Sequence, residues 1–400
     1  MNDKRALNRK YHDYNKIKIL IGIPCLLTGG TEMHTLDLVG VLTEAGYKVT
    51  VCCYFEFESD MVQEMERAGA RVRLLRLVRR REGKWKPLPR LAWNLRKVIQ
   101  EERPSVFHVQ YLAPGALPAL IGRLFNVPHL LATLHTPGHV YSRRLWTLRL
   151  IARQICSLFI CVSLEAEKAI FGNAALFSVD MLAQGRRHFT IFNGVDFSEM
   201  DRLLGAADSD LLRRRWNLGD RPVVGVVSRL NPVKGIDWLL ESFALVVREL
   251  PEVRLLVVGD GEARDFLMRQ AHALGVDDKV IWAGKLARAQ ALESYSVMDV
   301  VAVPSRFEGF GLSAAEAMGA GRPVVATDVD GLRDLVMEGV TGFRVPLGDT
   351  TTFANRILDL LSKKEKARVM GRAGRQSALK NFDRIIFQRY WTNLYQAMLS

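Results

Sequence analysis

The sequence predicts an α/β protein with two Rossmann-like domains, and three observations support this. Its 400 residues exceed the size of one ordinary core. Short runs rich in valine and isoleucine alternate with stretches of helical periodicity, which is typical of βαβ units on parallel sheets. A polar, charge-rich stretch at residues 198–221 interrupts this alternation before it resumes. We therefore predict an N-terminal domain over residues 1–200, a C-terminal domain over 201–382 and a final helix over 383–400.

The first predicted domain begins with a strand at residues 17–23. A glycine turn follows, and residues 33–45 then have helical periodicity. Further apolar runs that contain β-branched or aromatic residues predict strands at residues 47–53, 106–109, 129–134, 158–162 and 189–192.

The second predicted domain repeats this rhythm without a residue-level repeat. Its expected strands are residues 222–228, 253–258, 279–282, 299–303 and 323–326. The final segment has an apolar and aromatic stripe at helical spacing, which ordinary core packing explains. The stripe consists of Ile386, Phe387, Tyr390, Trp391, Leu394, Tyr395 and Met398.

The composition is that of an ordinary globular chain, with 25% charged and 48% hydrophobic residues. Five cysteines occur without a C-x-x-C pair, so we expect reduced thiols in a cytosol rather than a metal ribbon or redox motif. The apolar run from Ile19 to Leu27 contains Gly22 and Pro24, which favours a buried strand over a signal peptide. No run of about 18 apolar residues is present, so we expect no membrane-spanning helix.

Positive charge is concentrated in one part of the chain. The net charge is +13, and the segment Arg71–Lys97 holds eleven basic residues against one acid, Glu82. Trp85 and Trp93 lie within it, and a second basic and apolar segment spans Arg143–Arg153. Basic amphipathic segments with tryptophan suit an anionic membrane surface. A solvated basic face beside ordinary core packing explains them equally well.

The segment Pro304–Thr327 is the most informative stretch for function. It joins two predicted strands through a glycine-broken loop and a helix that we expect to begin near Ser313. Such a loop ends in helix N-terminal amides that attract anions, at the sheet edge where α/β proteins bind ligands. Glu308 and Glu316 bracket the turn, so the loop suits an anionic ligand with hydroxyls, such as a nucleotide-sugar. Ser313 and Glu316 also have the spacing of a capping box.

Four other loops carry candidate ligand-binding residues. Gly29 and Gly30 allow the backbone to approach a ligand closely, as do Gly259 and Gly261 after a later strand. The G-x-G lacks the third glycine of a dinucleotide fingerprint. His135 ends a predicted strand, where it can bond a sugar hydroxyl or handle a proton.

Arg229 and Lys234 form the fourth loop's pair of cations. They stand five residues apart after a predicted strand, so both can converge on a diphosphate. Two solvated cations on a loop are the alternative.

Two acid-x-acid pairs superficially match a metal site. Asp208 and Asp210 lie in the polar stretch, and Asp328 and Asp330 follow a strand without a histidine or third carboxylate nearby. We therefore expect no metal.

In order along the chain, these motifs resemble the GT4-type family of retaining glycosyltransferases, which have the two-domain GT-B fold. The resemblance covers nearly the whole sequence and ends in the family's E-x7-E signature, Glu308 to Glu316. The other matching residues are Gly29-Gly30-Thr31-Glu32, His135, Val162-Ser163, Asn193-Gly194-Val195-Asp196, Ser228-Arg229-Leu230, Lys234-Gly235 and Gly259-Asp260-Gly261.

The resemblance implies two parallel sheets facing across a cleft, with the C-terminal helix packing back on the N-terminal domain. It also implies a metal-independent hexosyltransferase that uses a UDP- or GDP-linked sugar and a glycan or lipid-linked acceptor, as in cell-envelope or polysaccharide biosynthesis. The reduced thiols and the basic segment Arg71–Lys97 predict a cytoplasmic location, either free or peripheral on the inner face of the membrane.

The resemblance also implies roles for the site residues. Arg229 and Lys234 would hold the donor diphosphate, and Glu316 the ribose. Glu308 would face the donor sugar, together with the backbone amides of Phe310, Gly311 and Leu312. His135 and Gly30 would complete the site from the N-terminal domain, with His135 and Glu308 nearest the chemistry.

Three positions depart from the family pattern. Phe192 replaces a frequent proline, Asp330 stands where a Gly-Gly pair is common, and Thr136 follows His135 where aspartate is frequent. These departures concern donor identity rather than fold. Two other functions stay open, namely sugar-nucleotide epimerisation or hydrolysis on the same fold, and a basic nucleic-acid-binding protein. The sugar-nucleotide motifs count against the nucleic-acid function.

Overall fold

The computed structural model describes residues 17–77, 88–111, 116–135 and 154–399. The chain forms two compact units. The N-terminal unit contains the chain up to Val162, residues 167–191 and the end of the chain from Gln388. The C-terminal unit contains residues 163–166 and 192–387. The cations at 79–81, 84 and 86 and the whole basic segment Arg143–Arg153 lie outside the described residues.

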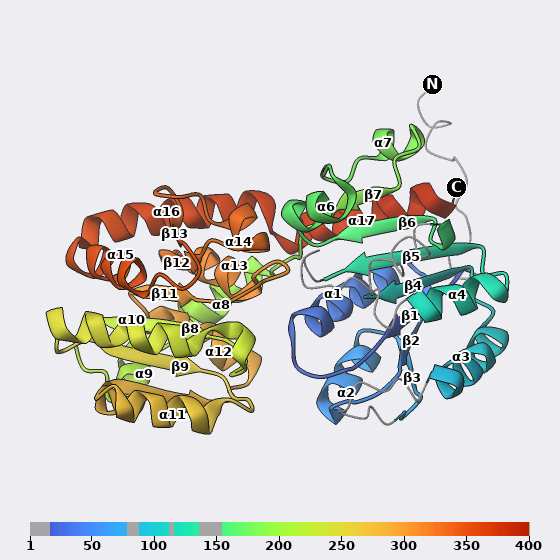
Figure 1. The fold of residues 1–400 in the computed structure, drawn as a ribbon. Helices are drawn as coiled ribbons and strands as arrows, with labels where there is room; N and C mark the ends of the chain where they lie inside the picture. The colour runs from blue at the N-terminus through green and yellow to red at the C-terminus, as the bar shows by residue number, and fades with distance from the viewer. Residues whose placement is uncertain (1–16, 78–87, 112–115, 136–153, 400) are drawn as a thin grey trace. The chain divides into compact units, whose positions relative to one another are not determined.

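The N-terminal unit is built on a seven-stranded parallel sheet in the order β3-β2-β1-β4-β5-β6-β7 (Figure 1). Its strands are β1 (Lys18–Ile23), β2 (Lys48–Cys53), β3 (Arg71–Leu74), β4 (Val106–Gln110), β5 (His129–Leu134), β6 (Leu158–Cys161) and β7 (His188–Thr190). We did not predict β3. It is a four-residue edge strand whose two arginines alternate with Val72 and Leu74, a pattern too short to distinguish from a loop.

Helices cover both faces of this sheet. The first helices are α1 (Gly30–Glu44), α2 (Ser59–Arg67), α3 (Leu88–Glu102), α4 (Ala116–Leu124), α6 (Leu164–Phe171) and α7 (Val179–Ala183). Leu91 and Leu95 of α3 and Ile121 of α4 share one buried cluster with strand residues such as Phe107 and Leu130. Helices α3 and α4 therefore cover the same face.

The final helix, α17 (Arg384–Leu399), confirms the predicted C-terminal helix. From Gln388 onward it belongs to the N-terminal unit. Trp391 and Tyr395 are fully buried, and the Trp391 ring lies 5.7 Å from that of His34 on α1. The predicted stripe is thus core, and it returns the chain to the N-terminal unit.

The C-terminal unit is built on a six-stranded parallel sheet in the order β10-β9-β8-β11-β12-β13. Its strands are β8 (Val223–Val227), β9 (Arg254–Val258), β10 (Val280–Gly284), β11 (Val300–Val303), β12 (Val324–Thr327) and β13 (Gly342–Val345). We did not predict β13. It has only four residues, one of which is Arg344, whose guanidinium lies 3.5 Å from the Asp328 carboxylate.

The helices of this unit follow the strands in alternation. They are α8 (Phe197–Ala206), α9 (Ser209–Arg215), α10 (Ile236–Glu249), α11 (Arg264–Ala273), α12 (Arg288–Ser294), α13 (Leu312–Gly319), α14 (Asp330–Leu335), α15 (Thr350–Ser362) and α16 (Lys364–Asn381), with 3₁₀ turns at Pro232–Lys234, Asp277–Lys279 and Tyr295–Val297. Phe243 of α10, Leu267 of α11 and Ile357 of α15 share one cluster with Val224 and Val257 of the sheet. These three helices therefore cover one face.

The polar stretch at residues 198–221, for which no helix or strand was predicted, contains helical segments. It forms most of α8 and all of α9, each capped by an aspartate at its N-terminus. Asp196 accepts a hydrogen bond from the Glu199 amide, and Asp208 accepts one from the Leu211 amide, both at 2.9 Å. Side-chain caps of this kind start short helices whose polar surfaces hide their periodicity.

No described helix has the length and apolarity needed to cross a bilayer.

Candidate active site

In the C-terminal unit, the predicted site residues gather at the carboxyl ends of β9, β8 and β11, which are neighbours in the sheet. The glycines after β9 pack directly against the loop after β8. A Cβ atom on Gly261 would lie 2.3 Å from the Leu230 carbonyl oxygen, and one on Gly259 would lie 1.9 Å from that of Ser228. Gly259 also has φ +137°, which disfavours other residues. This G-x-G thus serves close packing of two site loops.

Lys234 and Glu308 meet at this edge, although 74 residues separate them in the chain. The Lys234 ammonium donates to the Glu308 carboxylate at 2.6 Å, and the Ser305 hydroxyl donates to the same oxygen at 3.1 Å. Gly235, with φ +64°, lets the two loops approach, because a Cβ atom there would lie 2.0 Å from the Pro304 carbonyl oxygen. Arg229 follows β8 at the same edge with an exposed side chain.

A brace not predicted from the sequence holds the Glu308 loop. The Arg306 guanidinium bonds both carboxylate oxygens of Asp237, at 2.8 and 2.5 Å, and lies 4.0 Å from the Trp238 ring centre. Asp237 lies in the first turn of α10. The loop after β11 is therefore tied to the helix after β8, with the Lys234 loop between them.

Glu316 lies on α13 with its side chain nearly buried. The Arg288 guanidinium donates to one carboxylate oxygen and the Tyr295 hydroxyl donates to the other, both at 3.1 Å. Arg288 begins α12 and Tyr295 follows it, and the sequence contains no local pattern that links either residue to Glu316.

The predicted capping box was wrong. Helix α13 begins at Leu312, its N-cap is Gly311 with φ +107°, and no side chain caps it. Ser313 is therefore already inside the helix. The Glu316 carboxylate does not cap the helix and points to Arg288 and Tyr295 instead.

The Phe310 side chain is buried against other aromatic rings. Its ring lies 5.4 Å from the Phe382 ring and 5.9 Å from the Phe192 ring, in an aromatic cluster of this unit. Phe192, a departure from the family pattern, thus has a packing role. The amides of Phe310, Gly311 and Leu312 lead into α13, where unpaired N–H groups favour an anion.

In the N-terminal unit, Gly29, Gly30 and His135 lie at the carboxyl edge of the sheet. Gly29 is the N-cap of α1 and Gly30 its first residue, while His135 directly follows β5. The His135 ring lies 4.7 Å from that of His34 on α1 and 5.1 Å from that of Tyr111. The predicted meeting of His135 and Gly30 with the donor loops stays a prediction.

A buried polar chain surrounds His135. Its Nε2 lies 2.6 Å from the Gln110 carboxamide oxygen. His108, also buried, bonds the Thr133 hydroxyl at 2.7 Å and the Tyr395 hydroxyl at 2.8 Å. Burial lowers the pKa of His135 well below its usual range, and the neighbouring His34 and His108 lower this pKa further. His135 is therefore a neutral imidazole near pH 7.

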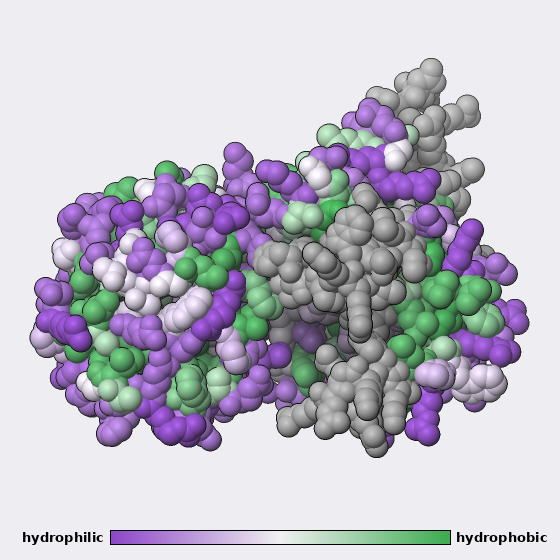
Figure 2. Space-filling model, viewed as in Figure 1, coloured by the Kyte–Doolittle hydropathy of each residue, from purple (hydrophilic) through white to green (hydrophobic). Residues whose placement is uncertain are grey.

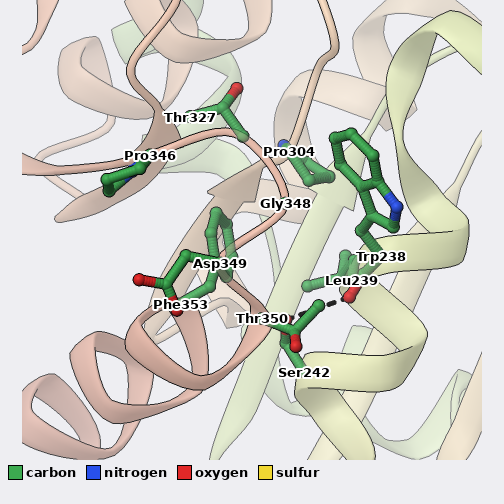
Figure 3. A pocket seen from close by; sticks show the side chains of 10 residues that line it. All are labelled: Trp238, Leu239, Ser242, Pro304, Thr327, Pro346, Gly348, Asp349, Thr350 and Phe353. Atoms are coloured by element: carbon green, nitrogen blue, oxygen red, sulfur yellow. Dashed lines mark hydrogen bonds between the residues drawn. The ribbon is translucent and has the colours of Figure 1, made fainter.

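One crevice near the site is too small for a sugar. It lies where β11, β12 and β13 end, between α10 and α15, and has a volume of about 10 Å³ (Figure 3). The Ser242 hydroxyl at its floor is occupied, since it donates to the Trp238 carbonyl at 3.0 Å. This space accommodates about one water molecule.

The acid-x-acid pairs have other partners in the structure. Asp208 caps α9, and Asp328 pairs with Arg333 at 3.0 Å. Among the described residues, no three histidine, cysteine or carboxylate side chains are grouped to hold a metal.

Two family models match the chain. "Glycosyltransferase Family 4" matches residues 28–173, and "Glycosyl transferases group 1" matches residues 208–377. The GDP-mannose-dependent alpha-(1-6)-phosphatidylinositol monomannoside mannosyltransferase of Mycobacterium tuberculosis is 30% identical over 366 residues, covering 87% of this chain and 89% of the relative. The chain belongs to glycosyltransferase family 4.

Other comparisons agree with this glycosyltransferase assignment. The mannosyltransferase of the same name from Mycolicibacterium smegmatis is 28% identical over 371 residues, covering 88% of this chain and 91% of the relative. The crystal structure of Anabaena HepE with UDP and glucose aligns with a TM-score of 0.79 over 95% of this chain and 99% of that one, at 22% identity. The predicted GT-B architecture and the predicted enzyme class are thus confirmed.

Proposed function

We propose that this glycosyltransferase transfers a hexose, with retention of configuration, from a nucleoside-diphospho-sugar to a glycan or lipid-linked hydroxyl. The Lys234–Glu308 pair beside the start of α13 carries the proposal. It places a cation, a carboxylate and helix-start amides at one sheet edge. A sugar diphosphate combines the two chemistries that these groups recognise, anionic phosphate and sugar hydroxyls.

The leaving diphosphate is the group that this site stabilises. As the glycosyl–phosphate bond breaks, negative charge grows on the diphosphate and positive charge grows on the sugar. Lys234, Arg229 and the amides that lead into α13 stabilise the first of these charges, which is often the largest electrostatic contribution to catalysis. Glu308 lies on the side of the sugar in this proposal. The acceptor attacks on the face that the diphosphate leaves, and the departing phosphate takes the acceptor proton.

Glu316 is the proposed ribose ligand. One of its carboxylate oxygens accepts a hydrogen bond from Arg288, and the other accepts one from Tyr295. A carboxylate oxygen has two lone pairs, so both oxygens keep capacity for ribose hydroxyls. Arg288 and Tyr295 would then orient the carboxylate before the donor arrives.

Two nucleotides remain candidates for the donor, and we propose a GDP-linked sugar. The mannosyltransferase that is 30% identical is GDP-mannose-dependent by name, whereas the Anabaena structure contains UDP at only 22% identity. The mycobacterial relatives also favour a phosphoinositide-type lipid acceptor of the cell envelope.

A thermal-shift panel of GDP-, UDP- and ADP-sugars tests the donor. A ligand that binds only the folded protein increases the free energy of unfolding, by about 2.7 kcal/mol at a ligand concentration of 100 times Kd. The melting temperature rises accordingly. We expect GDP-mannose to give the largest shift, and this shift to be lost in Lys234→Ala. A larger shift with a UDP-sugar would contradict the GDP assignment and leave the enzyme class intact.

We also propose that transfer needs no divalent metal, because cations and amides at the C-terminal sheet edge supply the positive charge. Transfer in excess EDTA should equal transfer in added Mg²⁺ or Mn²⁺. Loss of activity in EDTA with recovery on adding metal would contradict this proposal.

We propose that the N-terminal unit attaches to an anionic membrane, as on the inner, cytoplasmic face. Two cations of the predicted segment Arg71–Lys97 pair with acidic side chains in the structure. Arg71 and Arg73 on β3 pair with Glu102 and Glu101, at 3.3 and 2.5 Å, so their charges are neutralised locally. Among the described residues, further cations lie on α3, at Arg90, Arg96 and Lys97, and on α4, at Arg123.

The surface of α3 and α4 combines cations with exposed apolar side chains. Trp93 on α3 is 55% exposed and Leu124 on α4 is 65% exposed. Arg96 lies between two rings, 5.3 Å from the Trp93 centre and 5.5 Å from the Phe125 centre, so the two helices share one patch. A hydrophobic patch is visible over α4 in Figure 2. Tryptophan, leucine and cations together suit the interface of a bilayer with anionic headgroups.

Flotation with vesicles of phosphatidylglycerol and phosphatidylcholine tests this attachment. Arg96→Gln with Lys97→Gln should weaken binding by about 30-fold, at roughly 1 kcal/mol for each of the two cations. Arg214→Gln with Arg215→Gln, which removes the same charge from exposed α9, should leave binding unchanged. Equal loss in both variants, or none in the first, would contradict the assigned surface.

A further inference from the structure

The side chain of Gln110 contacts the imidazole of His135, and this contact determines which imidazole nitrogen can accept a hydrogen bond from a substrate. Both side chains are buried at the carboxyl ends of adjacent strands, since Gln110 ends β4 and His135 follows β5. The Gln110 carboxamide oxygen lies 2.6 Å from His135 Nε2. A carboxamide oxygen only accepts, so Nε2 must carry the hydrogen.

We propose that Gln110 is a positioning residue that holds His135 in its Nε2–H tautomer, so that Nδ1 is the hydrogen-bond acceptor for a sugar hydroxyl. A neutral imidazole has one donor and one acceptor nitrogen, and the bond at one nitrogen decides the role of the other. With Nε2–H committed to Gln110, Nδ1 holds the only lone pair. His135 thereby binds a hydroxyl as an acceptor and does not act as a cation on the diphosphate.

The rest of the buried chain supports this orientation of Gln110. Its carboxamide nitrogen lies on the opposite side, 3.4 Å from Nε2 of His108. His108 is in turn held by Thr133 and by Tyr395 of α17, at 2.7 and 2.8 Å. The carboxamide is thus set between two histidines, with its oxygen toward His135.

The surroundings of His135 favour the neutral form on which the tautomer argument depends. Among the described residues, the titratable groups that face it are His34 from α1, His108 from β4 and Tyr111 after β4. None of these three is a carboxylate, so none of them would stabilise an imidazolium. Burial and the two histidines lower the pKa of His135, in agreement with a neutral ring.

This inference rests on the proposed function and on a role of His135 in transfer. Two measurements distinguish a failure of the inference from a failure of the proposed function. Nitrogen-15 NMR of the histidine-labelled protein, with His135→Asn to assign the resonance among 8 histidines, reports the tautomer without any substrate. Transfer assays with the donor report the role. A chain that transfers no sugar would contradict the proposed function and leave the tautomer result intact.

Gln110→Leu should remove the preference for the Nε2–H tautomer and lower kcat/KM for transfer by about tenfold, the effect of one lost hydrogen bond. Thr133→Val is the matched control. This substitution removes the buried hydrogen bond between Thr133 and His108 but keeps the bond between Gln110 and His135. The tautomer of His135 and the kcat/KM for transfer should therefore equal those of the wild type.

Gln110→Glu gives a third readout that a merely structural role would not move. A carboxylate still accepts from Nε2–H and favours the imidazolium, so it raises the pKa of His135 above that in the wild type. The imidazolium has no acceptor at Nδ1, so the acid limb of the pH–rate profile should move to higher pH. An Nδ1–H tautomer in wild type, full transfer in Gln110→Leu, or an unmoved profile in Gln110→Glu would each overturn the proposal.

Discussion

The Lys234 ammonium lies 2.6 Å from the Glu308 carboxylate and joins the loops that follow β8 and β11. The pair is partly exposed, with 24% and 15% of the two side chains accessible, so a ligand can reach both. In the proposed complex, a donor phosphate would meet a lysine that Glu308 orients, and Ser305 holds the same Glu308 oxygen.

Lys234→Ala should lower kcat/KM for transfer by about 100-fold or more. The substitution removes one preorganised positive group from the leaving diphosphate and leaves Glu308 as an unpaired negative charge beside it. Lys279→Ala is the control, because Lys279 has the same 24% side-chain exposure and pairs with Asp278 at 3.0 Å. Steady-state kinetics measure kcat/KM for both variants, and circular dichroism verifies that both are folded. Wild-type activity in Lys234→Ala would refute the phosphate role.

Glu316→Ala should likewise abolish most transfer while the protein stays folded. It removes the carboxylate proposed to bind the ribose and strands the buried Tyr295 hydroxyl and the half-exposed Arg288. Nucleotide binding measured by calorimetry is the direct test. If Glu316→Ala bound the nucleoside diphosphate as tightly as wild type, the ribose assignment would be wrong.

Tyr295→Phe should have a graded effect at the same site. It removes the hydroxyl that donates to Glu316 and preserves the buried ring, so the carboxylate loses one orienting bond. We expect the KM for the donor to rise by about three- to tenfold with kcat nearly unchanged, in proportion to one hydrogen bond. A fall in kcat with an unchanged KM would place Tyr295 in the chemical step instead.

Asp334→Asn should change how stability depends on pH. Burial raises the pKa of Asp334 to about 6. The hydrogen bonds that its carboxylate accepts from the Leu164 and Glu165 amides lower this pKa, but by less than burial raises it. Between about pH 4 and 6 the folded protein therefore binds a proton that the unfolded chain does not, so stability falls as the pH rises through this window. Asparagine keeps an acceptor for the amides and removes the titration.

Urea unfolding of both proteins from pH 4.5 to 7.5 measures this effect. The stability of Asp334→Asn relative to wild type should increase as the pH rises from 4.5 to about 6 and then stay constant. A difference that does not vary with pH would mean that Asp334 titrates normally.

Glu167→Ala should destabilise the N-terminal unit strongly. Glu167 is fully buried and accepts from Arg186 at 2.9 Å, from His188 at 2.6 Å and from Thr190 at 2.7 Å. Removing one partner of a buried charge cluster costs about 3–5 kcal/mol, because the groups that remain buried lose the carboxylate that compensates their charge and their hydrogen bonds. In chemical denaturation, Glu199→Ala in the exposed pair with Arg202 should be indistinguishable from wild type. A small effect for Glu167→Ala would show that water replaces the carboxylate.

Local patterns allowed most strands and the motif order to be predicted. Apolar runs such as Val300–Val303 mark buried parallel strands in any context, and glycines such as Gly235 and Gly259 mark the loops between them. Edge strand β3 escaped prediction because Arg71 and Arg73 pair with acids far along the chain. Because these two arginines pair with acids, the number of cations in the sequence segment exceeds the number that contribute to a basic surface.

The sequence by itself determined the α/β class, the family and the loops in which the site residues lie, because these depend on residue type and spacing within short segments. Only the tertiary structure decided the partners of those residues. Glu316 meets Arg288 and Tyr295, and His135 meets Gln110, through strands and helices that pack side by side. Hydrogen bonds between such segments depend on three-dimensional packing, which residue spacing along one chain does not encode.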